Sequence, residues 1–484
     1  MNLQGKTVLV LGIGETGLSM AKWLLRRGAF VRGADTRTEP PGMKAFNSAL
    51  PHAEVFAGSF AAKAFCGVDL IAISPGVPLS EPLVQQALKE GVPVAGDMEL
   101  FAWAVRDTGI GRPKLVGITG SNGKTTVTAM TGAMLKKAGW DVEVAGNIGP
   151  AVLDALMRRE DTGKLPQAWV LELSSFQLET TEGLGLDAAA VLNVSEDHLD
   201  RYPGMPEYAA AKARIFLRGD SDTAAGGKDD SERIQVLNGD DPVVRQMALA
   251  GRPHVTFSLG MSQSDRDFGL LHEGGDTWLM QGDARLMKAN ELAISGRHNF
   301  ANALAALALC RALDIPLDPL LQALREFRGL PHRVEKVAAF TGITFYDDSK
   351  GTNVGATVAA LNGLEKPVVL IAGGDGKAQD FSPLAGPIAE HGRAVVLIGR
   401  DAEKIAAAIN ECGVPLHHAQ TMEEAVRKSF QLARKGDAVL MSPACASFDM
   451  FNNYVHRAEV FVAAVKSMQI AGTDDNSAAV AGWH

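Results

Sequence analysis

Cysteine is scarce in this sequence, and the four cysteines lie far apart. Cys66, Cys310, Cys412 and Cys445 form no C-x-x-C pair, so we expect neither a disulfide framework nor a zinc site. No apolar run approaches the roughly 20 residues that span a bilayer. The segment Met1–Val10 also lacks the basic region and long apolar stretch of a signal peptide. We therefore expect a cytoplasmic protein that is not inserted into a membrane.

Positive charge is also in short supply. The chain has 47 Lys and Arg against 56 Asp and Glu, a formal net charge of -9. Because phosphate backbones favour basic surfaces, this balance argues against general binding to nucleic acid. A length of 484 residues exceeds what one hydrophobic core usually organises, so several domains are expected.

The sequence does contain short runs of Val, Ile and Leu that alternate with helical patterns and end at glycines, which predicts α/β units with mostly parallel sheets. The clearest strands are Thr7–Leu11, Leu115–Thr119, Trp169–Leu173, Val368–Ala372 and Ala394–Ile398. Three blocks are predicted, at residues 1–110, 111–330 and 331–484, with a linker at Arg106–Pro113. Gly219–Glu232 is expected to be a surface loop and Ala471–His484 a frayed tail.

The strongest local signal is a phosphate-binding loop between a predicted strand and the helical pattern Val127–Ala138. Its glycines let successive amides face a polyphosphate, and the helix N-terminus adds a favourable dipole. Lys124 would neutralise the β- and γ-phosphates of a nucleotide, and the Thr125 hydroxyl would bind Mg²⁺. Ile118 stands where the longer Walker motif has glycine. The predicted nucleotide-binding residues are Gly120, Ser121, Asn122, Gly123, Lys124, Thr125 and Thr126.

Acidic residues follow two neighbouring apolar strands. Glu172 ends one strand, and Asp197 and His198 follow the strand Ala188–Val194. In a parallel sheet both groups emerge at the nucleotide edge, where they can reach Mg²⁺. His198 alone reads more simply as an ordinary loop histidine. The Asn-Lys-x-Asp motif of regulatory GTPases is absent.

A second glycine-rich turn lies near the N-terminus. Gly12, Gly14 and Gly17 follow a predicted strand and open the helix Leu18–Arg27, with Asp35 at the end of the next strand. This pattern is typical of a dinucleotide site and on its own favours NAD. Its physical basis is only a pyrophosphate at a helix N-terminus, which UDP satisfies equally.

Taken together these residues resemble the Mur ligases of peptidoglycan synthesis, over nearly the whole chain. The matching segments are Thr119–Thr125, Gly146–Gly149, Glu172–Glu179, Asn193–His198, Gly296–Asn299, Leu330–Arg333, Asp348–Asn353, Gly373–Lys377 and Ser442–Ser447. The resemblance implies three α/β domains: a Rossmann-like N-terminal domain for the UDP substrate, a central domain like those of P-loop NTPases for ATP, and a Rossmann-like C-terminal domain for an amino acid.

The motifs are most similar to the branch of the family that adds D-glutamate to UDP-N-acetylmuramoyl-L-alanine (UDP-MurNAc-L-Ala). The implied chemistry is ATP-dependent: the substrate carboxylate is phosphorylated to an acyl phosphate, which the amine of D-glutamate then attacks. The implied partners are these small molecules, with neither nucleic acid nor membrane, and a monomer is expected.

The resemblance also implies catalytic roles. Lys124 would stabilise the transferred phosphoryl group, Thr125 and Glu172 would hold one Mg²⁺, and His198 would hold a second. Asn147 would lie near the reacting carboxylate. Lys212 matches a lysine that the family carbamylates to a metal ligand, although its helical pattern alone predicts an exposed lysine.

The remaining implied contacts are to nucleotide and substrates. Asn302 matches the adenine contact, Arg333 a phosphate contact and Asp348 the ribose contact. The UDP substrate is implied to lie against Gly14, Asp35, Thr36, Arg37, Ser74, Pro75, Gly76, Ser174 and Gln177. The glutamate or acyl phosphate is implied to lie against Lys350, Thr352, Lys377, Ser447, Phe448 and Tyr454. At Phe448 the backbone rather than the ring is the expected contact.

Three alternatives remain at this point. A sister ligase could add another amino acid, but the Asp-Asn-Pro-Arg type of motif in the diaminopimelate- and lysine-adding members is absent. A folate polyglutamate ligase would share the central domain without the N-terminal UDP-binding block. An NAD oxidoreductase with an ATP-regulated domain would use the N-terminal fingerprint differently.

Overall fold

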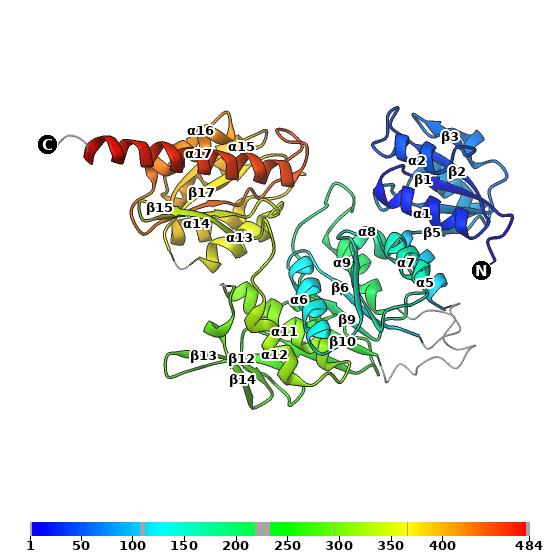
Figure 1. Ribbon diagram of the computed structural model, residues 1–484, viewed down its shortest axis with the longest axis horizontal. Coiled ribbons are helices and arrows are strands. Elements are labelled where there is room, and N and C mark those ends of the chain that lie inside the picture. The colour runs from blue at the N-terminus through cyan, green and yellow to red at the C-terminus, as the bar shows by residue number, and fades with distance from the viewer. Residues whose placement is uncertain (1, 107–111, 218–232, 295, 365, 481–484) are drawn as a thin grey trace. The chain divides into compact units, whose positions relative to one another are not determined.

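The structure is a computed structural model that describes residues 2–106, 112–217, 233–294, 296–364 and 366–480 (Figure 1). Within these ranges the strands form three sheets, of five, nine and six strands. The chain divides into two compact units. The first comprises Met1–Val194, Pro206–Met287 and Asn302–Leu324, and the second comprises Ser195–Met205, Lys288–Ala301 and Arg325–His484.

The N-terminal sheet, blue in Figure 1, is parallel throughout, with strand order β3-β2-β1-β4-β5. This is the doubly wound order of a Rossmann-like domain, as the sequence predicts. Its strands are β1 (Thr7–Leu11), β2 (Phe30–Asp35), β3 (Glu54–Ala57), β4 (Leu70–Ile73) and β5 (Val94–Ala95). Its helices are α1 (Glu15–Arg26), α2 (Met43–Ala49), α3 (Ala62–Phe65), α4 (Pro82–Lys89) and α5 (Asp97–Arg106).

Strand β1 shows why these residues form a central strand. Val8 and Val10 pack on one face with Met20 and Phe101 of α1 and α5, whereas Leu9 and Leu11 pack on the other with helix residues such as Val84 of α4. Successive side chains of a strand point to opposite faces. An unbroken apolar run is therefore what a strand covered by helices on both faces requires.

The central sheet carries the phosphate loop and has the order β14-β13-β12-β11-β10-β9-β6-β8-β7. Its strands are β6 (Lys114–Thr119), β7 (Val142–Gly146), β8 (Ala168–Glu172), β9 (Ala188–Val191), β10 (Ile234–Asn238), β11 (His254–Phe257), β12 (Phe268–Glu273), β13 (Asp276–Gln281) and β14 (Ala284–Lys288). Its helices are α6 (Lys124–Lys137), α7 (Val152–Asp161), α8 (Ser175–Glu179), α9 (Met205–Ala213), α10 (Pro242–Arg245), α11 (Arg297–Arg311) and α12 (Leu317–Glu326), with short 3₁₀ turns η1 (Arg214–Phe216) and η3 (Ala289–Glu291).

Strands β7, β8, β6, β9 and β10 run parallel, whereas β12 and β13 pair antiparallel in a hairpin. The carboxyl ends of β6, β7 and β8 therefore meet at one edge. Helix α11 packs against α6, where the Cys310 Sγ lies 3.7 Å from the Met134 Sδ. The helix that follows the phosphate loop is thus held in the core of the unit.

The C-terminal sheet has the order β15-β16-β20-β17-β18-β19 and is parallel apart from the β15–β16 pair. Its strands are β15 (Glu335–Phe340), β16 (Ile343–Asp347), β17 (Val368–Gly373), β18 (Gly392–Ile398), β19 (Leu416–His418) and β20 (Ala438–Met441). Its helices are α13 (Val354–Gly363), α14 (Ala385–His391), α15 (Ala402–Ile409), α16 (Met422–Leu432) and α17 (Tyr454–Val480), with 3₁₀ turns η4 (Ser382–Leu384) and η5 (Asn410–Cys412).

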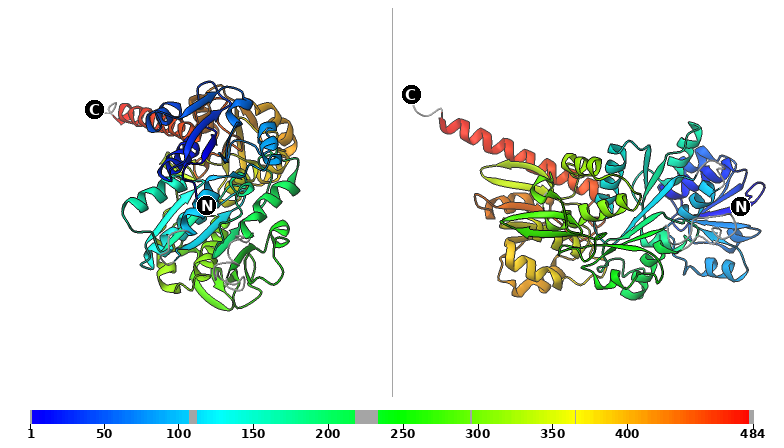
Figure 2. Two further views of the ribbon diagram at one scale, coloured as in Figure 1. Left: turned by 90° about the vertical axis from the view of Figure 1, so that its right-hand side faces the viewer. Right: turned by 90° about the horizontal axis from the view of Figure 1, so that it is seen from below.

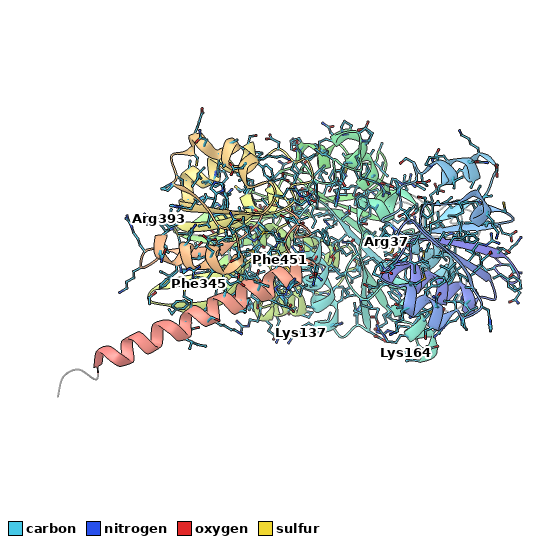
Figure 3. All side chains as sticks on the ribbon, turned by 90° about the horizontal axis from the view of Figure 1, so that it is seen from above. Arg37, Lys137, Lys164, Phe345, Arg393 and Phe451 are labelled. Atoms are coloured by element: carbon cyan, nitrogen blue, oxygen red, sulfur yellow. The ribbon has the colours of Figure 1, made fainter. Side chains whose placement is uncertain are left out.

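Both faces of this sheet are covered as well. Val369 and Ile371 of β17 pack with Phe461 of α17, and Leu370 packs on the other face with Ile405 of α15. Phe345, labelled in Figure 3, stacks on Phe340 with ring centroids 5.0 Å apart. The predicted α/β class and its three domain types are therefore confirmed.

The expectation of a frayed tail from Ala471 is wrong for residues 471–480. Helix α17 continues to Val480, and Figure 2 shows it running past the edge of its sheet. No proline follows Tyr454 to end the helix. The predicted loop Gly219–Glu232 and most of the predicted linker Arg106–Pro113 lie outside the described residues. Among the helices in the described ranges, none combines the length and apolar character that crossing a bilayer requires.

Candidate active site

A pocket of about 540 Å³ opens at the carboxyl edge of the N-terminal sheet. Strands β1 and β4 are neighbours there, and the chain order reverses between them, which is where α/β sheets bind ligands. The pocket is lined from β1, β2 and β4, and also by loops of the central domain. It brings together residues that the sequence predicts for substrate binding, namely Gly14, Asp35, Thr36, Arg37, Ser74, Pro75, Gly76, Asn147 and Gln177.

Asp35 braces the glycine-rich turn of this pocket. Its Oδ2 accepts from the backbone N–H of Ile13 at 2.7 Å, and its Oδ1 accepts from the Arg37 Nε at 2.8 Å. Burial opposes ionisation of Asp35, but hydrogen bonds from Arg37 and Ile13 hold its pKa below the ordinary value. The carboxylate is therefore a fixed anion that ties the end of β2 to the turn after β1. Arg37, labelled in Figure 3, is half exposed beside it.

The phosphate loop has the backbone conformation that its glycines predict. Gly120 and Gly123 have φ of +152° and +84°, backbone angles that residues other than glycine rarely adopt. A Cβ on Gly123 would also lie 2.6 Å from the Asn302 Oδ1. Helix α6 begins at Lys124, directly after the loop, so the positive end of its dipole lies at the loop. These features suit a bound phosphate chain, and they place Asn302 against the loop.

Asn193, which the sequence does not single out, holds the loop from the β9 side. Its backbone oxygen accepts from the Ser121 N–H at 2.9 Å. Its side chain accepts from the Asn122 N–H at 2.8 Å and donates to the Asn122 oxygen at 3.1 Å. The loop is thus braced before any ligand binds. An asparagine near the end of an apolar strand, beside a phosphate loop, is the signal that could have identified it.

Two lysines lie over the loop. The Lys124 ammonium donates to the oxygens of Gly120 and Ser121 at 2.8 and 2.9 Å. The Lys212 ammonium also donates to the Gly120 oxygen, at 3.0 Å, and lies 4.3 Å from the centre of the Tyr208 ring. Tyr208 in turn shares a 3.2 Å hydrogen bond with the Ser121 hydroxyl. Both cations are therefore held where phosphate charge would be neutralised.

The expectation of an exposed lysine at position 212 is wrong, because Lys212 is only 1% exposed. Helix α9 presents Tyr208 and Lys212, one turn apart, to the phosphate loop rather than to solvent. The weak amphipathic pattern of its alanine-rich sequence does not reveal that face.

Glu172 lies at the end of β8, opposite Ile118 of β6 and Gly146 of β7. Its side chain is buried, and its Oε1 accepts from the Asn147 Nδ2 at 2.8 Å. Its Oε2 is buried with no hydrogen-bond partner in the described residues. A buried carboxylate oxygen of this kind is expected to bind a cation. Its position beside the phosphate loop fits Mg²⁺, a hard cation that takes oxygen ligands.

The second unit contains Asp197 and His198, together with Lys377. The Lys377 ammonium lies 3.5 Å from the Asp197 Oδ1, and Asn353 donates to the Asp197 Oδ2 at 3.2 Å. The His198 Nε2 is 3.6 Å from the same carboxylate, and His198 has φ of +56°. Asp197 therefore gathers a lysine, an asparagine and a histidine around one carboxylate.

Asp348 and Arg333 are also neighbours in this unit. Burial raises the pKa of Asp348 to about 7, although the Ser442 hydroxyl and the nearby Arg333 favour its ionised form. The Ser442 Oγ donates to the Asp348 Oδ2 at 2.6 Å. Asp348 is 6% exposed, so its carboxylate is held in place by the loop after β20.

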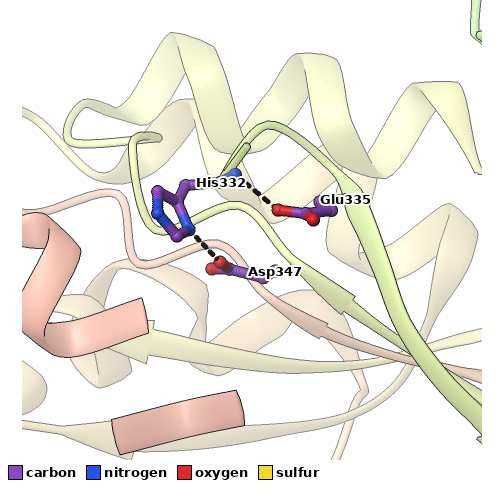
Figure 4. A group of neighbouring side chains, drawn as sticks. All are labelled: His332, Glu335 and Asp347. Atoms are coloured by element: carbon purple, nitrogen blue, oxygen red, sulfur yellow. Dashed lines mark hydrogen bonds and ion pairs between the residues drawn. The ribbon is translucent and has the colours of Figure 1, made fainter. Parts of the chain in front are cut away.

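A group of three side chains supports the segment around Arg333. His332 shares a 2.7 Å hydrogen bond between its Nδ1 and the Asp347 Oδ2, and Glu335 accepts from the His332 N–H at 2.9 Å (Figure 4). Their ligand atoms lie within 4.8 Å of one another, but they bind each other. The His332 oxygen accepts from the Lys350 N–H at 3.2 Å, and the Lys350 ammonium lies 5.2 Å from the centre of the Tyr454 ring. His332 thus connects the segment at Arg333 to Lys350, which in turn contacts Tyr454.

Arg457, which sequence reasoning missed, joins the two loops that carry the predicted glutamate contacts. It donates to the Ser349 oxygen at 2.8 Å and to the Cys445 oxygen at 3.1 Å. Burial lowers its pKa to about 10. Two predicted glutamate contacts that follow Cys445 in the chain differ in exposure: Ser447 is buried, whereas Phe448 is 75% exposed. No sequence signal distinguishes Arg457 from the solvated arginines of other helices.

The predicted residues thus gather in three places. The first unit holds two of them: the pocket at the N-terminal sheet, and the phosphate loop with Glu172 and Lys212. Asn147 belongs to both, since it lines the pocket and donates to Glu172. Ser174 belongs to the same region, since it caps α8 with Gln177. The second unit holds His198, Arg333, Asp348, Lys350, Thr352, Lys377, Ser447, Phe448 and Tyr454. Within it, Thr352 donates its N–H to the Lys350 oxygen at 3.0 Å.

Three family models match this chain in sequence. The model described as Mur ligase MurD-like, N-terminal domain, matches residues 6–96. The Mur ligase middle domain matches residues 118–310, and the Mur ligase, glutamate ligase domain, matches residues 332–445.

Curated relatives are similar over the whole length. The chain is 84% identical over 484 residues to a UDP-N-acetylmuramoylalanine–D-glutamate ligase of Nitrosospira multiformis, covering 100% of both chains. It is 60% identical over 469 residues to the ligase of the same name from Nitrosomonas europaea, covering 97% of this chain and 98% of that one.

Solved structures share the fold at low identity. The UDP-N-acetylmuramate-alanine ligase MurC of Thermotoga maritima has a TM-score of 0.58 at 21% identity, covering 96% of this chain and 99% of that one. MurF of Acinetobacter baumannii has a TM-score of 0.59 at 18% identity, covering 95% and 91%. A folylpolyglutamate synthase of Mycobacterium tuberculosis has a TM-score of 0.54 at 17% identity, covering 72% and 91%.

Proposed function

Since this chain belongs to the Mur ligase family, we propose that it catalyses the ATP-dependent addition of D-glutamate to UDP-MurNAc-L-Ala in peptidoglycan synthesis. Relatives that carry this name align with it from end to end, at up to 84% identity among those compared. The N-terminal glycine turn then binds a UDP pyrophosphate rather than NAD, in agreement with the match to the MurD-like N-terminal domain.

The reaction proceeds in two steps. The alanyl carboxylate of the UDP substrate attacks the γ-phosphorus of ATP, so that ADP leaves and an acyl phosphate forms. The amine of D-glutamate then attacks the acyl carbon, loses a proton and expels inorganic phosphate. A carboxylate cannot otherwise be acylating, because its leaving group would be oxide. The protein's task is to position these groups and to neutralise their charge.

The observation that carries this proposal is the double contact of Asn147. Asn147 lines the pocket beneath the UDP-type turn and also donates to Glu172, beside the phosphate loop. A substrate that lies in the pocket can therefore extend its carboxylate toward the phosphate loop past a single amide. The pocket and the phosphate loop lie next to each other in one unit. Phosphoryl transfer between their two ligands requires this proximity.

On the ATP side, the loop residues would hold the phosphates, Lys124 would bear on the transferred phosphoryl group, and Asn302 would contact the adenine. Thr125 and Glu172 would hold Mg²⁺, which supplies charge neutralisation between the β- and γ-phosphates when it is bound. The unpartnered Oε2 of Glu172 supports that role. Glu172 would then have both carboxylate oxygens in use, one on Asn147 and one on the metal.

Lys212 is the proposed site of carbamylation, and His198 is proposed separately as a ligand of a second Mg²⁺. The 1% exposure of Lys212 and its contact with the phosphate loop support this proposal. A carbamate would replace a cation by an anion at that position.

The second unit would bind D-glutamate and part of the nucleotide. Lys377 would pair with a glutamate carboxylate, with Lys350, Thr352, Ser447, Tyr454 and the backbone at Phe448 nearby, while Arg333 and Asp348 would contact a phosphate and the ribose. The contact of Lys377 with Asp197 supports a lysine whose position is fixed before the substrate binds. The same proposal includes domains at residues 1–110, 111–330 and 331–484, a cytoplasmic location and a monomeric state.

The proposal is tested by phosphate release from ATP with UDP-MurNAc-L-Ala and a panel of amino acids. We expect turnover with D-glutamate and little with L-glutamate, L-lysine, L-alanine or meso-diaminopimelate. Turnover with L-lysine or diaminopimelate but not with D-glutamate would overturn the assignment within the family. Phosphate release that is independent of the UDP substrate would overturn the acyl-phosphate chemistry.

A further inference from the structure

A buried acid outside the predicted catalytic set lies behind the substrate pocket. Asp97, the first residue of α5, is 3% exposed, and its Oδ2 accepts from the Gln177 Nε2 at 2.9 Å. Its Oδ1 is buried with no hydrogen-bond partner in the described part of the chain. Burial raises the pKa of Asp97 to about 6, although the Gln177 amide and the adjacent backbone amides favour ionisation. Because such a group costs stability, a purely structural role explains it poorly.

The Gln177 amide is fixed at three points. Its Oε1 accepts from the Ser174 N–H at 3.1 Å and from the Ser174 hydroxyl at 3.2 Å, while its Nε2 donates to Asp97. A backbone N–H can only donate and an ionised carboxylate can only accept, so the amide fits in one orientation only. One hydrogen of Nε2 is used by Asp97, and the second remains for the pocket that Gln177 lines.

We propose that Asp97 is a positioning residue that orients the Gln177 amide, so that its second N–H donates to an oxygen of the UDP-linked substrate. The assignment rests on the proposed function, because it takes the pocket ligand to be the UDP-linked substrate. Asp97 itself does not line the pocket. Its effect on the substrate therefore passes through Gln177.

A neighbouring contact provides a matched control for mere cross-linking of α5 to the central domain. Glu99, on the same helix, accepts from the N–H groups of Glu182 and Gly183, both at 2.7 Å. It is also buried, and it does not line the pocket. Replacing Glu99 thus breaks a similar tie between the same two regions without touching Gln177.

The test measures binding of UDP-MurNAc-L-Ala to the full-length protein by calorimetry, without ATP. Asp97→Leu, which removes the acceptor, should raise the Kd about tenfold, the size of one lost hydrogen bond. Asp97→Asn, whose side-chain oxygen can still accept, should stay within about twofold of the wild type. Glu99→Leu should leave the Kd unchanged even though it lowers the unfolding temperature. The affinity for ATP should not change in any of the three variants.

Non-additivity separates positioning from an independent effect. Gln177→Leu should weaken binding by about as much as Asp97→Leu, and the double variant should be no weaker than Gln177→Leu alone. Asp97→Ala carries the same expectation as Asp97→Leu if the larger residue prevents folding. Additive losses, an Asp97→Asn variant as weak as Asp97→Leu, or an equal loss in Glu99→Leu would each overturn the proposal. If the wild-type protein did not bind the UDP substrate at all, the proposed function would fail instead, whatever the variants showed.

Discussion

Single buried charges account for much of what is specific in this structure. Lys212, Glu172 and Arg457 are each about 1% exposed. Burial of a charge is costly unless specific partners compensate for it. Arg457 has such partners in the Ser349 and Cys445 oxygens, whereas one oxygen of Glu172 has none among the described residues. Arg457 is therefore a brace for two loops, and Glu172 is the residue that we propose as a metal ligand.

Lys212→Ala should lower kcat by about 100-fold or more, because an electrostatic or metal-holding group at the reacting phosphates is worth several kcal/mol. Short-chain carboxylates such as acetate should restore part of the lost activity by supplying the missing oxygens. Steady-state phosphate release checks both effects, with Lys136→Ala, an exposed lysine on α6, as the control. Full activity of Lys212→Ala, or a loss that no carboxylate relieves, would argue against the carbamate.

At the scale of elements, the phosphate loop depends on how its neighbours hold it. Asn193 braces the loop from β9, and Asn302 of α11 lies against Gly123. Helix α6 starts directly after Gly123 without a side-chain cap. The site is therefore built from a helix N-terminus and from contacts made by three separate segments.

Gly123→Ala tests this arrangement. The new Cβ would lie 2.6 Å from the Asn302 Oδ1, and the alanine would have to adopt a φ of +84°. Gly139→Ala is a matched control, because Gly139 has φ of +86° with nothing within 4 Å of its Cβ position. Both variants should lose about 1 kcal/mol of unfolding free energy through the positive φ. Only Gly123→Ala should raise the KM for ATP, and an equal rise in both would show that the contact with Asn302 does not matter.

At the scale of the whole molecule, the sequence predicts the architecture well because its signals are local. Apolar runs such as Thr7–Leu11 match β1 residue for residue, and the glycine turns lie at the carboxyl ends of β1 and β6. The pocket residues gather as predicted because the carboxyl ends of parallel strands share an edge.

Sequence patterns do not predict the features that depend on contacts between residues far apart in the chain. The burial of Lys212 depends on contacts of α9 with a loop about 90 positions away in the chain, at Gly120. The role of Arg457 depends on Ser349, 108 positions away. Asp97, Asn193 and Tyr208 likewise acquire their partners only through the fold. No residue pattern within a short window carries that information.

If the reaction proceeds through an acyl phosphate, one carboxylate oxygen of the UDP substrate passes to inorganic phosphate. The most direct measurement uses UDP-MurNAc-L-Ala labelled with oxygen-18 in its alanyl carboxylate, together with ATP and D-glutamate, and follows the products by mass spectrometry. We expect one labelled oxygen in each inorganic phosphate and a nucleotide product extended by one glutamate. Label found in AMP, or phosphate that carries no label while the glutamyl product forms, would contradict it.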